Sequence, residues 1–374
     1  MRVLALAAAF AALLLAQPNP RVGFYQWESP IRDALLPSPL FTAPSLIERA
    51  GAGLFRIYVG SRFDYLHPVL SPQRFEGVAH CTPVDILRLS RYRHVVEHPA
   101  LRTIILTVYP SRDYGGGCDD INLSRPGIGA ALDDEYRQMF ALSEYLLNTY
   151  GNLDKTVILA NTEADNRMLE IMRHTGSSEL AIRNMIAWQN TRFRAVDQAR
   201  RRHPNTRLKL LNAFEIALVN LAIEQQGYRF VKSPRGRWNA LRDVVPKASF
   251  DLLSYSAYES TNAPFETGVI DSPPEGTGQR LARDLTLIAR ETSKPVMIGE
   301  LGIPRDVYDR LPSGGVEPRL ASALAAIRRL RPAYVVFWQV YDAPAGRLEP
   351  VEFGWLDPAR APSRLLLEFV RSYR

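Results

Sequence analysis

Short apolar runs recur along the chain. In each run, apolar residues occupy successive positions instead of every second one, which is typical of strands covered on both faces in a parallel sheet. The stretch over 294–302 shows the form most clearly, because Pro295 stands before its apolar residues and Gly-Glu-Leu-Gly ends it. We predict strands over 21–27, 54–59, 102–109, 157–163, 208–214, 250–258, 296–300 and 334–340.

Segments with apolar residues at helical spacing separate these runs. One of them ends at Gly151, an expected C-cap, and the longest stops just before Pro204. We predict helices over 83–94, 133–150, 179–202, 278–291, 318–329 and 363–373, with weaker ones over 46–50 and 238–245.

Strands that alternate with helices form either a (β/α)8 TIM barrel or a doubly wound open sheet, both of the α/β class. No Gly-rich phosphate turn follows the first strand, which weakens a nucleotide-binding open sheet. The count of eight strands favours the barrel, and we expect residues 17–374 to form one catalytic barrel domain. Long loops over 60–82, 110–131 and 259–277 would then wall the same face and suit an extended substrate groove.

The composition is that of a globular protein, with 374 residues, 46% hydrophobic and 23% charged. The formal charge of +7 is spread out, and its small Arg clusters fit solvated helix faces. We therefore expect no nucleic-acid partner, and we expect a monomer.

The first 16 residues carry one positive charge followed by a short run of Leu and Ala. This pattern is typical of a secretory signal peptide and is too short to span a bilayer comfortably. We expect segment 1–16 to be a signal and the protein to be secreted or periplasmic, with no membrane contact beyond export. Leu14, at the minus-three position, leaves an uncleaved anchor open as the alternative.

The chain has two cysteines, Cys81 and Cys118, both in segments expected to be loops. In an exported protein such a pair favours a disulfide, which would stabilise the fold by about 3–4 kcal/mol in the loop-entropy model. No further ligands stand at zinc-like spacing, so we expect no metal and no cofactor.

Carboxylates end two of the predicted strands, Glu163 on the fourth and Glu300 on the seventh. In a barrel these strands lie across the mouth from each other, so the two carboxylates can flank one bond. Glycoside hydrolysis requires such a pair, because one carboxyl protonates the leaving oxygen while the other attacks or activates water.

Other polar and aromatic residues stand near the same strand ends. We expect Arg56 to keep Glu300 ionised, Tyr258 to hydrogen-bond the same carboxylate, and Asn161 to bind a sugar hydroxyl. Trp338 and Trp27 are candidate platforms for sugar rings. Structural roles stay open for these residues: an ion pair for Arg56, barrel core for Trp338, and packing under a loop for Trp27.

At these positions the chain resembles the clan A glycoside hydrolases, retaining (β/α)8 enzymes that include the cellulase-like family five. The resemblance covers all eight strands, and its later motifs, Ser-Tyr-Ser-Ala-Tyr and Phe-Trp-Gln-Val-Tyr-Asp, are most similar to poorly characterised bacterial members. It implies that Glu163 is the acid/base, Glu300 the nucleophile, Arg56 and Tyr258 partners of the nucleophile, and Trp338 the platform. Asn161-Thr162-Glu163 departs from the adjacent Asn-Glu of that group.

We therefore expect a retaining glycosidase that acts on a poly- or oligosaccharide. A barrel that binds carbohydrate without catalysis and a transglycosylase are the alternatives. A metal-dependent hydrolase is disfavoured, since no paired His ends a strand, and a serine hydrolase lacks its Gly-x-Ser-x-Gly turn.

The expected geometry follows from the retaining mechanism. The carboxyl groups of Glu163 and Glu300 should lie about 5–5.5 Å apart. Because strand side chains alternate, a regular fourth strand should direct Asn161 and Glu163 to the same face without a bulge. Glu215 is expected as a charge at a helix N-terminus, with a third active-site carboxylate as the alternative. Asp165 is expected to order its loop, with a part in catalysis as the alternative.

Overall fold

The computed structural model describes residues 17–26, 38–60, 82–109, 111–113, 118–120, 123–124, 127–223, 230–232, 238–262, 269, 271–342, 352–358 and 360–373. The expected signal segment 1–16, Trp27 and Cys81 lie outside these residues, as does the side chain of Cys118. The signal, the disulfide and the Trp27 platform therefore stay predictions.

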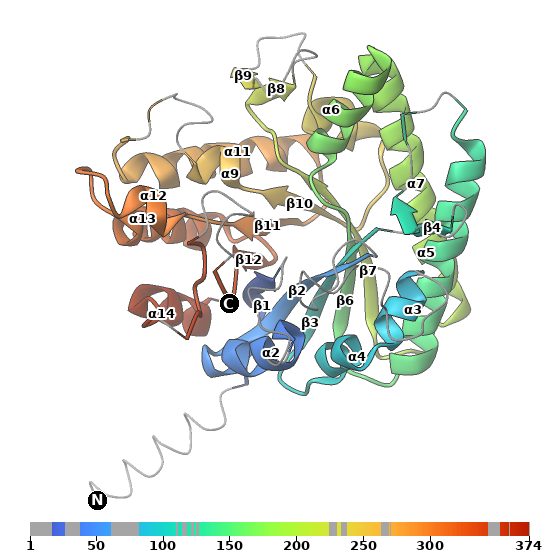
Figure 1. The fold of residues 1–374 in the computed structure, drawn as a ribbon, viewed down its shortest axis with the longest axis horizontal. Coiled ribbons are helices and arrows are strands. Elements are labelled where there is room, and N and C mark those ends of the chain that lie inside the picture. The colour runs from blue at the N-terminus through green and yellow to red at the C-terminus, as the bar shows by residue number, and fades with distance from the viewer. Residues whose placement is uncertain are drawn as a thin grey trace, which may run out of the picture.

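Eight parallel strands close into a barrel in their order along the chain, as the sequence predicted. The helices surround this barrel (Figure 1). The strands are β1 (Asn19–Gln26), β2 (Ala52–Val59), β3 (Thr103–Val108), β6 (Thr156–Ala160), β7 (Lys209–Ile216), β10 (Leu252–Ser256), β11 (Val296–Leu301) and β12 (Val335–Trp338).

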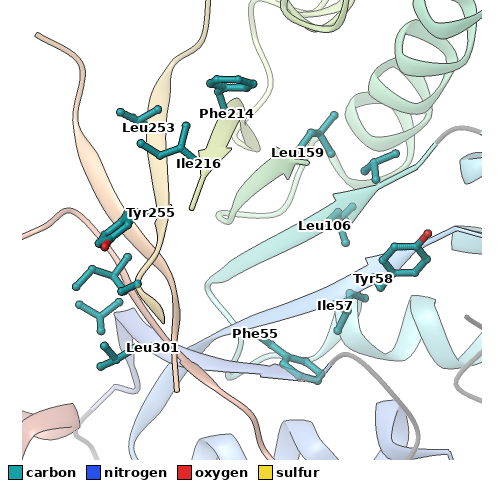
Figure 2. Packing of buried hydrophobic residues seen from close by; sticks show 14 of the residues in the cluster. Phe55, Ile57, Tyr58, Leu106, Leu159, Phe214, Ile216, Leu253, Tyr255 and Leu301 are labelled. Carbon is teal, nitrogen blue, oxygen red and sulfur yellow. The ribbon is translucent and has the colours of Figure 1, made fainter. Parts of the chain in front are cut away.

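The strands are apolar at successive positions because each contributes to two cores. Residues such as Phe55, Leu106 and Leu159 face outward and pack under the helices (Figure 2). Their neighbours Leu54, Ile105 and Ile158 belong to a smaller cluster to which all eight strands contribute, and which fills the barrel interior. Every residue of β2 and β3 is buried, so burial on both faces supplies the hydrophobic contribution that holds the strands together.

The helices are α2 (Pro39–Arg49), α3 (Pro83–Arg88), α4 (Ser90–Glu97), α5 (Gly129–Tyr150), α6 (Ala164–Thr175), α7 (Ser178–Arg202), α8 (Ala240–Asp243), α9 (Tyr258–Thr261), α11 (Glu275–Glu291), α12 (Arg305–Tyr308), α13 (Val316–Leu330) and α14 (Arg364–Ser372). A 3-10 turn, η1 (Val245–Lys247), and two small hairpins, β4 (Ser111–Asp113) with β5 (Cys118–Asp120) and β8 (Leu221–Ile223) with β9 (Phe230–Lys232), complete the described elements. None of the described helices is long and apolar enough to cross a membrane.

Several boundaries differ from the prediction for local reasons. The helix expected over 83–94 is two helices, because Leu89 adopts an extended conformation between α3 and α4. Helix α6 was not predicted: Glu163, the N-cap residue before it, is not one of the usual capping residues and makes no side-chain cap hydrogen bond, so the usual start signal is missing. Helix α2 begins at Pro39, earlier than expected, because proline is tolerated in the first turn of a helix. The helix also includes Pro44.

A buried ion pair fastens two outer helices to the barrel. Arg192 on α7 is fully buried and donates to Glu135 Oε1 on α5 at 2.8 Å. The same guanidinium donates to the Val108 and Ala160 carbonyls at the ends of β3 and β6, both at 3.1 Å. The pair thus ties α5 and α7 to the end of the barrel from which Asn161 and Glu163 emerge.

Replacing Glu135 with Ala should lower the free energy of unfolding by about 3–5 kcal/mol, because Arg192 would keep its charge in a buried place without its partner. Urea unfolding of the purified variant measures this change. Glu368→Ala is the matched control, since Glu368 pairs with Arg364 on the surface, and it should change stability by no more than about 0.5 kcal/mol. Equal effects of the two substitutions would contradict the structural role given to the Glu135–Arg192 pair.

Candidate active site

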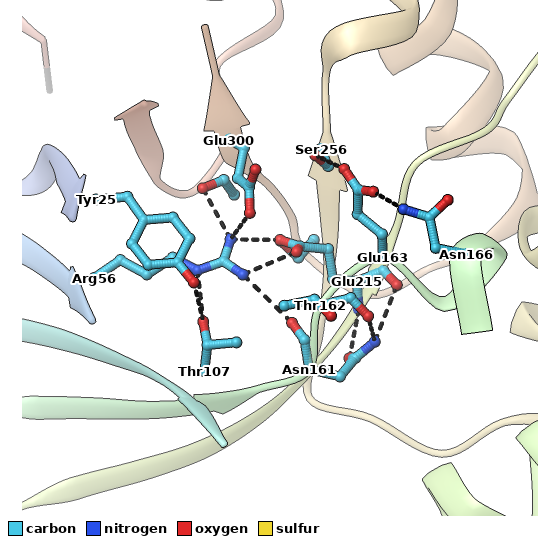
Figure 3. A network of polar contacts seen from close by, with 12 residues as sticks. Tyr25, Arg56, Thr107, Asn161, Thr162, Glu163, Asn166, Glu215, Ser256 and Glu300 are labelled. Atoms are coloured by element: carbon cyan, nitrogen blue, oxygen red, sulfur yellow. Dashed lines mark hydrogen bonds and ion pairs between the residues drawn. The ribbon is translucent and has the colours of Figure 1, made fainter. Parts of the chain in front are cut away.

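Arg56 lies at the centre of a polar cluster inside the barrel (Figure 3). Leu54 faces the interior and Phe55 faces outward, so alternation along β2 directs Arg56 inward, where it is fully buried. Its Nη1 and Nη2 donate to Glu215 Oε2 at 2.6 Å and Oε1 at 2.8 Å. Its Nε donates to Thr107 Oγ1 at 2.9 Å, so the side chain spans from β2 to β3 and β7.

Further contacts complete the surroundings of Arg56. Its Nη1 donates to the Gly299 carbonyl at 3.0 Å, and its Nη2 to the Asn161 carbonyl at 3.4 Å. The Tyr25 ring lies 4.4 Å from the guanidinium carbon, a cation–π contact. Burial lowers the pKa of Arg56, but the nearby Glu215 and Glu300 charges more than offset this and hold the pKa above its ordinary value. Arg56 is therefore a permanent positive charge inside the barrel.

Glu215 corrects one expectation from the sequence. The strand expected to stop at Phe214 continues to Ile216, and Ala213 faces the interior, so Glu215 also points inward and is no helix N-terminal charge. Ser254 Oγ on β10 donates to Glu215 Oε2 at 2.6 Å, beside the two bonds from Arg56. The alternation of Ala213, Phe214 and Glu215 was the signal in the sequence that would have placed this carboxylate in the barrel.

Glu300 reaches the site through an irregularity in β11. Met297 faces the interior and Ile298 faces outward, so strict alternation would turn Gly299 inward and Glu300 away. The pairing of β11 with β10 and β12 shifts register here, as in a β-bulge, and Glu300 lies inward beside Arg56. A Cβ at Gly299 would lie 2.2 Å from Glu215 Oε2 and 2.1 Å from Ser254 Oγ, so only glycine fits at this position.

Two groups favour the ionised form of Glu300. Arg56 Nη1 lies 3.5 Å from Glu300 Oε1, and the Tyr258 hydroxyl hydrogen-bonds the carboxylate. Burial nevertheless raises the pKa of Glu300 well above its ordinary value, and the like charges of Glu215 and Glu163 act in the same direction. The expectation that Arg56 and Tyr258 lie at Glu300 is confirmed, although Arg56 lies closer to Glu215.

Tyr258 approaches from a helix and not from a strand. β10 ends at Ser256, and Tyr258 is the first residue of α9. Burial, and the charges of Glu300 and Glu163, raise the pKa of its hydroxyl far above the ordinary tyrosine value. The hydroxyl is therefore protonated and able to donate to Glu300.

Glu163 enters the same site from the N-terminus of α6. Its Oε1 accepts from Ser256 Oγ at 2.7 Å, and its Oε2 accepts from Asn166 Nδ2. Burial, with the like charges of Glu215 and Asp165, raises the pKa of Glu163 to about 7 against the opposing effects of Ser256 and Arg56. Glu163 can therefore hold a proton near neutral pH.

The path of the chain to Glu163 differs from the expected regular strand. β6 ends at Ala160, and Ile158 and Ala160 are the residues that face the interior. Continued alternation would thus turn Asn161 and Glu163 outward together. Glu163 enters the site only because the strand stops and the backbone turns at this residue, with φ −4° and ψ 90°. The expectation that a regular strand directs Asn161 and Glu163 into the site was wrong, because alternation alone did not establish which face Asn161 occupies.

Asn161 joins β6 to β7. The residue is fully buried, its Oδ1 accepts from the Glu215 amide at 2.8 Å, and its Nδ2 donates to the Glu215 carbonyl at 3.2 Å and the Thr162 carbonyl at 2.8 Å. These bonds fix the backbone of Glu215 on one side and of the Glu163 segment on the other. A direct contact between Asn161 and a sugar stays a prediction.

Aromatic rings pack around Tyr258, the hydrogen-bond partner of Glu300. Trp338 is 9% exposed and meets Tyr25 and Tyr258 edge to face, with ring centroids 4.9 and 6.4 Å apart. Phe353 lies in the segment after β12 and was not among the expected site residues. Its ring centroid lies 6.4 Å from that of Tyr258. Its position depends on the return of a loop, for which the sequence holds no periodic signal.

Two aspartates near the site have structural contacts. Asp165 accepts backbone N–H bonds from Ala217, Leu218 and Ala240, so its role is structural, but it orders the segment after β7 and the start of α8 instead of its own loop. Asp342 accepts from the Gly354 amide and pairs with Arg360. Within the described ranges, no group of three His, Cys, Asp or Glu side chains is placed to hold a metal ion.

The fold is shared with solved glycoside hydrolase structures, although no family model and no curated protein matches the chain. The exo-β-1,4-mannosidase Op5Man5 from Opitutaceae bacterium strain TAV5 matches 95% of this chain with a TM-score of 0.62 and 18% identity. This chain spans only 60% of that protein's length.

Two further structures match over nearly their whole length. XEG5A, a GH5 xyloglucan-specific endo-β-1,4-glucanase from a metagenomic library, has a TM-score of 0.60 and 12% identity, with 98% of this chain and 99% of that one covered. An endo-1,4-β-D-mannanase from Thermotoga petrophila RKU-1 has a TM-score of 0.51 and 14% identity, with 95% and 99% covered. The resemblance seen in the sequence is thus confirmed in the fold: the chain has the (β/α)8 barrel of GH5-type, clan A glycoside hydrolases.

Proposed function

We propose that this protein is a glycoside hydrolase that acts by a retaining double displacement, with Glu300 as nucleophile and Glu163 as acid/base. One observation carries the proposal: two carboxyls from opposite sides of the barrel enter one buried site, and their donors differ. Arg56 and Tyr258 contact Glu300, whereas the donors to Glu163 among the described residues, Ser256 and Asn166, are neutral. This difference suits one ionised and one protonated carboxyl.

The chemistry follows from that division. Glu163 gives its proton to the glycosidic oxygen while a Glu300 oxygen attacks the anomeric carbon, so the C–O bond breaks and a glycosyl ester forms on Glu300. Glu163, now ionised, takes a proton from a water that attacks the same carbon and releases the sugar. Trp338 offers an apolar ring surface beside Glu300 for a sugar face.

The substrate class is a poly- or oligosaccharide. The neighbours in fold are named for β-1,4-linked mannan and glucan substrates, so β-1,4-linked polysaccharides are the first to test. The signal-like segment 1–16 supports the same proposal, since an exported enzyme meets polysaccharides outside the cell. A carbohydrate-binding barrel would not need two carboxyls held with different donors.

A panel of mannans, glucans, xyloglucan and aryl β-glycosides should reveal a hydrolysed substrate by the release of reducing sugar or aryl alcohol. On that substrate, Glu300→Gln should lower kcat by roughly 10⁴-fold or more, because an amide is a poor nucleophile. Glu368→Gln, on the surface, is the matched control and should keep full activity. Binding of a polysaccharide without turnover by the unsubstituted protein would favour the non-catalytic barrel instead.

The acid/base role of Glu163 has a pH signature. The kcat/KM for glycosides with poor leaving groups should fall as the pH rises through about 7, because Glu163 then loses the proton that it must donate. Glu163→Ala should lower kcat/KM on such substrates by about 10²–10⁴-fold and remove this limb, yet retain the first step on aryl glycosides with activated leaving groups. Equal losses on both substrate types would reverse or refute the assignment.

Retention itself is a separate expectation. The first product observed by proton NMR should keep the anomeric configuration of the substrate, and a crystal structure should place the two carboxyl groups about 5–5.5 Å apart. An inverted product with a spacing of about 6.5–9.5 Å would make Glu300 a general base for water instead.

A further inference from the structure

The buried cluster holds more negative than positive charge. Three carboxyls, from Glu163, Glu215 and Glu300, surround the single guanidinium of Arg56. With all three ionised, the cluster would carry a net charge of −2 in a place that water barely reaches, which is strongly unfavourable. Without Glu215, the same cluster would carry only −1, and both remaining carboxyls would ionise more readily.

Glu215 is held as a carboxylate. It accepts both terminal nitrogens of Arg56, at 2.6 and 2.8 Å, and the hydroxyl of Ser254 at 2.6 Å. An ionised carboxylate is acceptor-only, and these donors match its two oxygens. The side chain is fully buried and both of its oxygens are engaged, so it is placed to act through Arg56 and not on a substrate.

Glu215 also engages both terminal nitrogens of Arg56, so the guanidinium does not form a two-pronged pair with Glu300. The guanidinium makes its short, two-pronged contact with Glu215 and a longer one, at 3.5 Å, with Glu300. A carboxylate bound by both arms of an Arg would have its oxygens engaged, which would weaken it as a nucleophile. Glu300 is therefore stabilised by the guanidinium but not bound by it in a two-pronged pair.

We propose that Glu215 is a positioning residue: its carboxylate neutralises Arg56, and this keeps one proton on the Glu163–Glu300 pair and an unclamped oxygen on Glu300. The inference rests on the proposed function for its meaning in catalysis. The retained proton is the one that Glu163 delivers to the leaving oxygen.

The charged and titratable groups that face the Glu163–Glu300 pair come from five elements. They are Tyr25 on β1, Arg56 on β2, Asp165 on α6, Glu215 on β7 and Tyr258 on α9. Asp165 is satisfied by three backbone N–H groups, and the raised pKa of Tyr258 keeps its hydroxyl neutral. Among these described groups, Glu215 is the charge that offsets Arg56.

The test is a titration that needs no substrate. Protein labelled with ¹³C at the glutamate carboxyl carbon is titrated by NMR, and the Glu163 and Glu300 signals are assigned from Glu163→Gln and Glu300→Gln. In Glu215→Gln, both carboxyls should ionise at a lower pH than in the unsubstituted protein. The matched control is Glu135→Gln, which also removes a buried carboxylate from an Arg but lies outside the barrel, and it should leave both titrations unchanged.

A second comparison keeps the test decisive if Glu215→Gln does not fold. Arg56→Gln/Glu215→Gln has the same net charge as the unsubstituted cluster, whereas Arg56→Gln alone is one unit more negative. The two carboxyls should therefore ionise at a lower pH in the double variant than in Arg56→Gln. Unchanged titration in Glu215→Gln, or no difference within this second pair, would overturn the proposal.

The activity readout separates this inference from the proposed function. If a substrate is found, the alkaline limb of kcat/KM should move to lower pH in Glu215→Gln, a shift that purely structural damage would not produce. A protein that hydrolyses no glycoside but shows the shifted titrations would refute the glycosidase and leave the charge relation intact. A hydrolase with unshifted titrations would do the opposite.

Discussion

The ion pair between Arg56 and Glu215 is the interaction on which the C-terminal end of the barrel depends, where the candidate active site lies. A guanidinium inside a protein is stable only when its charge is balanced and its N–H groups are bonded. Here the acceptors come from β3, β7, β11 and the end of β6, and the Tyr25 ring from β1 covers the group. The charge therefore ties β2 to β3, β7, β11 and the end of β6.

The sequence was sufficient for the barrel and for part of the site. All eight strands and their order were predictable, because burial on both faces leaves uninterrupted apolar runs that few other structures produce. Arg56, Tyr258 and Glu300 were also brought together correctly, since strand ends of a closed barrel converge. Such inferences need only the periodicity of the chain and its topology.

The remaining features depend on interruptions of that periodicity. The bulge that directs Glu300 inward, the early end of β6 before Glu163, and the extra residues of β7 that include Glu215 each change the strand by one to three positions. A shift of one residue reverses the face of every side chain after it. No propensity marks such a shift strongly, so the direction of Glu163 was not predictable, whereas the inward direction of Glu215 needed the alternation of Ala213 and Phe214 to be continued by one residue. Gly299 was visible in the sequence, but its reason, the space needed by Glu215 and Ser254, is a tertiary one.

The site also shows how two residues of one type acquire different properties in one cavity. Burial raises the pKa of both Glu163 and Glu300, so desolvation alone does not distinguish them. Their donors do: a guanidinium and a phenol favour charge on Glu300, whereas a serine hydroxyl and an amide at Glu163 give a weaker preference. Because the two like charges share one site, the ionisation of either carboxyl opposes that of the other, and the two titrate as a pair. The asymmetry of donors then decides where the single proton resides, and that asymmetry originates in the bulge at Gly299, which places Glu300 beside Arg56 and leaves Glu163 on the far side of the cluster.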